Sequence, residues 1–167
     1  ILGLVEAANS VWENGFMCNK LFSAELFQAK PRIRFNTDIK YVEDQPILLD
    51  CFIRCGEMAD ITDTKYHYFI NPNSLTGTEF NLNKISATIG FKHMCEVCDE
   101  YIPELSDSFK AKYYSICIGF LLQRETRKSK QHKKMLAVEV RKNLKEILGL
   151  KNMNVKFKIA AIIFSII

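Results

Sequence analysis

Two adjacent carboxylates, Glu43 and Asp44, are the residues of this chain best placed by type and position to do acid–base chemistry. They follow a stretch of alternating apolar and polar residues that begins at Phe35, and they precede a helical apolar spacing from Ile47 to Cys55. The pair is therefore expected where an extended segment becomes the first turn of a helix. Unpaired backbone N–H groups in a first turn stabilise negative charge.

This position allows two interpretations. In the first, Glu43 and Asp44 only stabilise the start of a helix, because acidic residues are ordinary in a first turn. In the second, one carboxylate is a general base, held on a rigid element beside a cleft. The spacing alone leaves both interpretations open.

The elements around the pair would position it. Gly56 is expected to end the helix that follows, in the left-handed conformation that glycine adopts readily. Two short strands are predicted next, at Glu57–Ile61 and Tyr66–Ile70, because both stretches are rich in strand-forming residues. From about residue 78 onward the apolar spacing predicts helices throughout.

Four segments occur in a fixed order along the chain: Gly15-Phe-Met-Cys-Asn-Lys-Leu-Phe22, Ile33-Arg-Phe-Asn36, Glu43-Asp44, and Tyr66-His-Tyr-Phe-Ile-Asn-Pro-Asn-Ser-Leu-Thr76. This series resembles the C-terminal half of bacterial family 2 glycosyltransferases of the GT-A fold. The resemblance implies an α/β fold, in which residues 1–77 form the acceptor-side portion of the catalytic domain from short strands and helices. Residues 78–167 would be a basic, all-helical tail, and association of this tail with a membrane is one option.

The resemblance also implies an activity and a set of site residues. Family 2 enzymes of the inverting type move a sugar from a nucleotide-sugar donor to a hydroxyl of a glycan or lipid-linked acceptor. Asp44 would be the catalytic base, and Glu43 would orient it or touch the acceptor. The substrate-binding candidates come from the other segments and from Trp12: Trp12, Asn19, Lys20, His67, Asn71 and Ser74.

Each binding candidate has a simpler explanation as well. Lys20 could neutralise diphosphate charge or pair with Glu43 or Asp44, yet a surface lysine at a strand end is equally ordinary. Trp12 could stack on a sugar face or simply be half-buried.

The last segment carries a departure from the family pattern. Phe69 stands where relatives usually carry an arginine, and the exchange removes a bidentate phosphate contact. His67, Asn71 and Ser74 could contact the donor instead, although turn stabilisation explains Asn71 and Ser74 equally well.

No metal site is predicted within the chain. Cys95-Glu-Val-Cys98 is a single CxxC, without a second pair to complete four ligands. The resemblance implies that Mg²⁺ or Mn²⁺ serves the full-length enzyme through an Asp-x-Asp pair that this sequence lacks. The donor-binding half is also missing, so these 167 residues alone are expected to be inactive.

Charge is distributed unevenly along the chain. Residues 1–109 hold 9 Lys/Arg and 16 Asp/Glu, whereas residues 110–167 hold 14 and 3. The basic run Arg124–Lys134, together with the apolar run Ile159–Ile167, fits docking on an anionic inner leaflet, and it also fits a merely solvated helix end. The apolar run is shorter than the roughly 20 residues that span a bilayer.

These features predict a cytoplasmic protein, peripheral at the inner face of the plasma membrane, that acts in cell-surface polysaccharide synthesis. The alternative is a non-catalytic helical adaptor that binds a membrane surface or a protein partner through its basic tail. Nucleic-acid binding is not expected, because residues 124–145 lack interleaved aromatics and any known reading motif.

Overall fold

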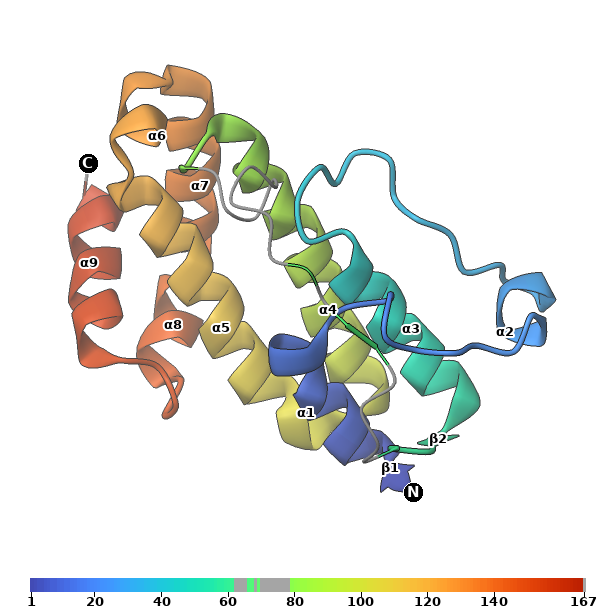
Figure 1. Ribbon diagram of the computed structural model, residues 1–167. Helices are drawn as coiled ribbons and strands as arrows, with labels where there is room; N and C mark the ends of the chain where they lie inside the picture. The colour runs from blue at the N-terminus through green and yellow to red at the C-terminus, as the bar shows by residue number, and fades with distance from the viewer. Residues whose placement is uncertain (62–65, 68, 70–78, 167) are drawn as a thin grey trace. The chain divides into compact units, whose positions relative to one another are not determined.

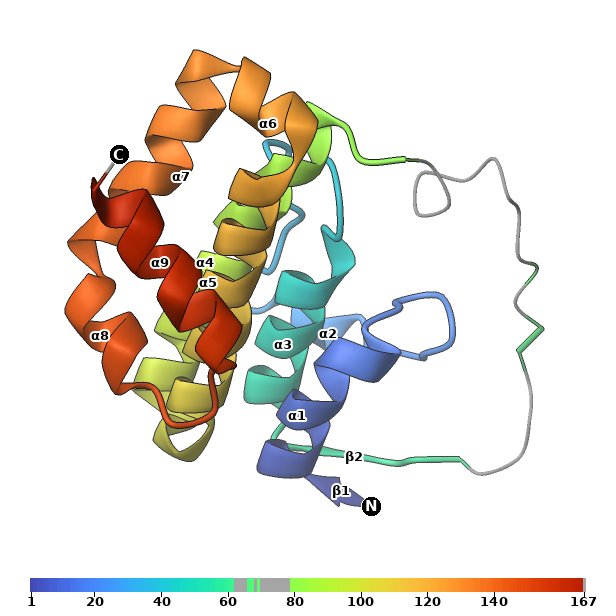
Figure 2. The same ribbon diagram turned by 90° about the vertical axis from the view of Figure 1, so that its left-hand side faces the viewer.

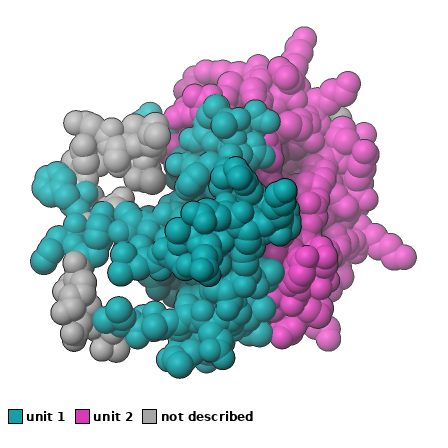
Figure 3. All heavy atoms as spheres, turned by 90° about the vertical axis from the view of Figure 1, so that its right-hand side faces the viewer, with its two compact units in different colours: residues 1–79 teal, residues 80–167 magenta. Residues whose placement is uncertain are grey.

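The structure is a computed structural model that describes residues 1–61, 66, 67, 69 and 79–166 (Figure 1). The chain divides into two compact units, Ile1–Glu79 (unit 1) and Phe80–Ile167 (unit 2), which are coloured teal and magenta in Figure 3. The division into compact units does not test the predicted division into a catalytic portion (1–77) and a helical tail (78–167). The functional division stays a prediction.

The predicted α/β fold is wrong. Within the described residues the strands are only β1 (Leu2–Gly3) and β2 (Glu57–Met58), which pair antiparallel with Leu2 opposite Met58. The strand predicted at Glu57–Ile61 is thus reduced to two residues, and most of the one predicted at Tyr66–Ile70 lies outside the described residues. A two-residue pair offers no face on which a core could form, so helices supply the core instead.

Unit 1 is built on the packing of α1 (Leu4–Asn14) against α3 (Asp44–Cys55). The face that α1 buries consists of Ala7, Ala8 and Val11, all with no exposed area. Small side chains of this kind allow two helices to approach closely. The short helix α2 (Glu25–Gln28) lies between α1 and α3 in the sequence.

The end of α3 confirms its prediction, whereas the segment before it does not. Gly56 has a φ of 72°, and its N–H donates to the carbonyl oxygen of Phe52 at 2.9 Å. The stretch from Phe35 is not an extended strand, because the Asn36 side chain accepts a hydrogen bond from the Asp38 N–H at 2.9 Å. The Ile39 N–H also donates to the Asn36 carbonyl oxygen at 3.1 Å, which completes a turn.

Unit 2 confirms the prediction of helices from about residue 78 onward, for the residues described there. Its helical elements are η1 (Leu82–Ser86), α4 (Ala87–Tyr101), α5 (Pro103–Leu122), α6 (Arg124–Lys128), α7 (Lys130–Lys142), α8 (Leu144–Gly149) and α9 (Val155–Ile166). The long helix α5 packs against α4, α7 and α9 (Figures 1 and 2). It begins at Pro103, and proline is well accepted at the first helical position.

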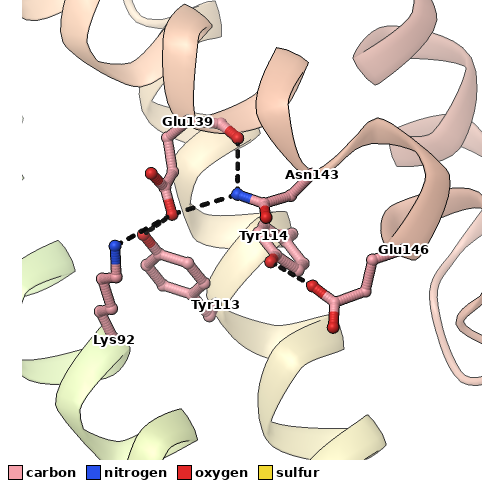
Figure 4. Close-up of polar contacts among 6 residues, drawn as sticks. All are labelled: Lys92, Tyr113, Tyr114, Glu139, Asn143 and Glu146. Atoms are coloured by element: carbon pink, nitrogen blue, oxygen red, sulfur yellow. Dashed lines mark hydrogen bonds and ion pairs between the residues drawn. The ribbon is translucent and has the colours of Figure 1, made fainter.

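A network of polar contacts lies where α7 ends and α8 begins. Glu139 of α7 accepts a hydrogen bond from the Tyr113 hydroxyl at 3.0 Å and pairs with Lys92 at 3.6 Å (Figure 4). The side-chain amide of Asn143 donates to the carbonyl oxygen of Glu139 at 2.9 Å, at the residue that separates α7 from α8. An asparagine that bonds the backbone in this way competes with helix continuation.

Candidate functional site

Apolar side chains from the segments behind the resemblance pack around the first two turns of α3. Ile33, Ile47 and Cys51 form a buried cluster, and the partly buried Met17 and Phe22 pack against it. Met17 and Phe22 belong to the first of the four segments, Ile33 to the second, and Ile47 to the helix that begins with Asp44. The first three segments therefore meet in one place, although they are separate in the sequence.

Gly15 brings the loop after α1 directly onto the first turn of α3. A Cβ atom at this position would lie 2.4 Å from the carbonyl oxygen of Val11 and 2.5 Å from Cγ of Gln45. Both distances are far shorter than any van der Waals contact, so only glycine fits here. Gln45 follows Asp44 directly, and this contact therefore sets the loop against the candidate base.

Hydrogen bonds from Lys20 stabilise the same loop. Its ammonium group donates to the carbonyl oxygens of Asn14 at 2.7 Å and Phe16 at 2.8 Å, and to Oδ1 of Asn19 at 2.7 Å. These bonds engage all three donors of the ammonium group. Lys20 and Asn19 are thus brought together as predicted candidates, but Lys20 serves first to close the loop.

Asp44 is half-buried in the first turn of α3. Burial raises the pKa of its carboxyl group above the ordinary value, and the charge of Glu43 adds to this rise. Hydrogen bonds from the backbone of Asp44 itself, Met17 and Gln45 act in the opposite direction. Burial lowers the pKa of Lys20, and the negative charge of Asp44 acts in the opposite direction.

Glu43 does not cap α3. Its backbone is helical, with φ −68° and ψ −19°, and its exposed side chain makes no cap hydrogen bond. The residue before it, Val42, has a φ of 62°, which is strained for a β-branched residue. The chain therefore enters α3 through a strained turn rather than through the predicted extended segment, and helix capping does not account for Glu43.

The remaining candidates are less closely tied to Asp44. Trp12 is half-buried in α1, one turn before Gly15, and His67 is exposed in the short described stretch 66–67. Asn71 and Ser74 lie outside the described residues. Among the described candidates, the structure thus gathers Asn19, Lys20 and Asp44.

Two residues that sequence reasoning missed hold this site together. Gln45, in the first turn of α3, lies against Gly15. Arg54, in the last turn of α3, donates through Nη1 to the carbonyl oxygen of Leu26 at 2.5 Å and through Nη2 to that of Pro31. Carbonyl groups in the last turn of a short helix and just after it need such donors, but the sequence gives no signal of which distant arginine supplies them.

The clearest hollows of the described surface are lined by unit 2 residues alone. One, of about 510 Å³, is lined by residues 80–83 with Glu125, Lys128 and Ser129. The other, of about 300 Å³, lies between α7 and α9. Neither is lined by Asp44, so the acceptor cleft that a general base requires stays a prediction.

Metal and thiol chemistry find little support in the described part of the chain. No group of three or more His, Cys, Asp or Glu side chains is arranged there to hold a metal ion. The divalent cation implied by the resemblance therefore has no fitting ligand set here, and no reaction step is assigned to it. Cys95 and Cys98 are buried, and burial raises the pKa of Cys98 to about 12, which keeps that thiol protonated at neutral pH.

Comparison of the chain with protein-family models, with curated proteins and with solved structures finds no match. Among the helices described here, none is both long enough and apolar enough to cross a membrane.

Proposed function

We propose that this chain carries the general base of an inverting glycosyltransferase, and that Asp44 is this base. The observation that carries the proposal is the setting of Asp44, which is half-buried in a first helical turn, has a raised pKa, and lies beside the loop closed by Lys20. A raised pKa makes an ionised carboxylate a stronger proton acceptor. A helix start holds the carboxylate more rigidly than a loop would.

The chemistry follows from this setting. Asp44 takes the proton of an acceptor hydroxyl as the hydroxyl oxygen attacks the anomeric carbon of the donor sugar. The bond from that carbon to the leaving nucleoside diphosphate breaks on the opposite face, so the configuration at the carbon inverts. Glu43 is exposed next to Asp44 and is suited to contact the acceptor, while the positive charge of Lys20 favours the negatively charged substrates.

The decisive experiment replaces Asp44 in an enzyme that contains both this chain and its donor-binding part. Asp44→Asn should lower the rate of sugar transfer by about 10² to 10⁴, the usual contribution of general base catalysis. Asp60→Asn is the matched control, because Asp60 is exposed in the same unit, and it should leave the rate unchanged. Retention of configuration in the product, or full activity of the Asp44 variant, would contradict the proposal.

The alternative of a non-catalytic adaptor makes a different prediction for the same variants. An adaptor would lose no property when Asp44 becomes asparagine, because the two side chains have the same size. Circular dichroism of both variants checks that a loss of transfer reflects chemistry rather than unfolding.

A further inference from the structure

A basic groove of about 300 Å³ runs between α7 and α9 in unit 2. It is lined by Lys130, Lys133, Lys134, Ala137, Val138 and Arg141 of α7 and by Phe164 of α9. The α7 residues are spaced three, four, seven, eight and eleven positions after the first, which places them on one face of the helix. Four cations therefore line a single narrow groove.

The groove carries a net positive charge, because no acidic side chain in its lining neutralises the four basic ones. Glu139, the carboxylate of α7, bonds Tyr113 and Asn143 instead (Figure 4). Arg141 also fixes the groove wall, since its Nε donates to the carbonyl oxygen of Ser165 in α9 at 2.9 Å. The basic side chains thus lie on a helix that packs against another helix, and not on an unstructured tail.

An exposed apolar stripe runs along α9. Its members are Val155, Ile159, Ile162, Ile163 and Ile166, with exposed fractions of 67%, 53%, 42%, 52% and 79%. Their spacing places them on one face of the helix, and Ala161 on the opposite face is fully buried. Figure 2 shows α9 in front of α5 on the viewer's side, with α7 beside it.

The positive charge of residues 110–167 indicates which kind of partner covers the apolar stripe of α9. A second copy packed stripe against stripe would bring two basic grooves together. Residues 110–167 hold 14 Lys/Arg against 3 Asp/Glu, so such pairing is repulsive. A bilayer that contains anionic lipids satisfies both features. Its acyl boundary accepts branched apolar side chains, and its phosphate groups attract the lysines of α7.

We infer that α7 and α9 together form a docking surface for an anionic lipid bilayer. The apolar stripe of α9 enters the boundary between headgroups and acyl chains, and the cations of the basic groove contact lipid phosphates. This inference does not depend on the proposed sugar transfer. It assigns binding to α7 and α9, whereas the charge of the run Arg124–Lys134 alone does not single out these helices.

The test is cosedimentation of the full chain with vesicles of phosphatidylcholine, with and without phosphatidylglycerol. Binding should require phosphatidylglycerol and weaken as salt is added. The triple variant Lys130→Gln, Lys133→Gln, Lys134→Gln should bind roughly 100-fold more weakly, which corresponds to about 1 kcal/mol for each lysine. The matched control is the triple variant Lys142→Gln, Lys145→Gln, Lys151→Gln, which removes the same charge from exposed positions outside the groove and should lose far less.

A second variant tests the apolar part of the surface. Ile159→Ser with Ile163→Ser should reduce vesicle binding at every salt concentration, and the helical circular dichroism should stay unchanged because both side chains are exposed. Equal binding to neutral and anionic vesicles, equal losses in the two triple variants, or no vesicle binding would overturn the inference. So would a dimer, seen by analytical ultracentrifugation, that the isoleucine variant dissociates.

Discussion

At the scale of single residues, the burial that distinguishes Asp44 has a consequence for stability. A carboxyl group whose pKa is higher in the folded state than in the unfolded state ionises first in the unfolded chain as the pH rises. Protonated Asp44 therefore contributes to the free energy of unfolding at low pH. This contribution is lost as the pH rises from about 3.9, the pKa in the unfolded chain, through the higher pKa of the folded state.

This reasoning predicts that Asp44→Asn makes the protein more stable at neutral pH, because the amide carries no charge to bury. The gain should disappear as the pH falls below about 3.9, where the carboxyl group is protonated in both states. Thermal melts followed by circular dichroism between acidic and neutral pH measure this difference. A less stable variant at neutral pH would show that the hydrogen bonds from backbone N–H groups outweigh the burial of the charge.

The backbone of Val42 gives a second prediction at this scale. A φ of 62° disfavours any side chain with a Cβ atom by about 1–2 kcal/mol. Val42→Gly should therefore be more stable than Val42→Ala, in spite of the greater flexibility of glycine in the unfolded chain. The control is Val5 in α1, where the alanine variant should be the more stable one by about 1 kcal/mol. Urea denaturation of the four variants gives the comparison, and the same order at both positions would contradict the left-handed conformation of Val42.

At the scale of elements, the contact between the loop after α1 and the start of α3 is what positions the candidate base. Gly15→Ala should lower the free energy of unfolding by about 1–3 kcal/mol, because the added Cβ atom overlaps Val11 and Gln45. Gly3→Ala is the matched control, since a Cβ atom there meets no atom within 4 Å. If the two variants unfold at the same urea concentration, the loop does not rest on α3 as described.

At the scale of the whole molecule, each unit has its own set of buried side chains. Those that unit 2 buries in α5, α7 and α8 include Ile118, Leu121, Leu136, Val140 and Ile147, each 2% exposed or less. A separate core is what allows a domain to fold alone. Residues 80–167 expressed alone should therefore keep their helical circular dichroism and bind anionic vesicles, whereas residues 1–79 should not bind them. Loss of helix in the isolated segment would contradict this prediction.

Helix ends were the part of the fold that local sequence could predict. Gly56 ends α3, as the glycine after the helical apolar spacing predicted. The extended segment expected before Glu43 was wrong for a local reason as well, since the Asn36 side chain forms a turn that competes with an extended chain. The break between α7 and α8 at Asn143 lies beside contacts from Glu139 to α4 and α5, and no local pattern specifies such contacts.

The amino-acid sequence by itself determined the helical character of residues 79–166, the limits of α3, the pairing of two acids at its start and the concentration of cations in the second half of the chain. These features depend on residues within a turn or two of one another. Only the tertiary structure decided that Asp44 is half-buried, that Gly15 and Lys20 hold a loop against it, and that the cations of α7 line a groove against α9. Burial and side-chain partnership arise between residues far apart in the sequence, and no local pattern specifies them.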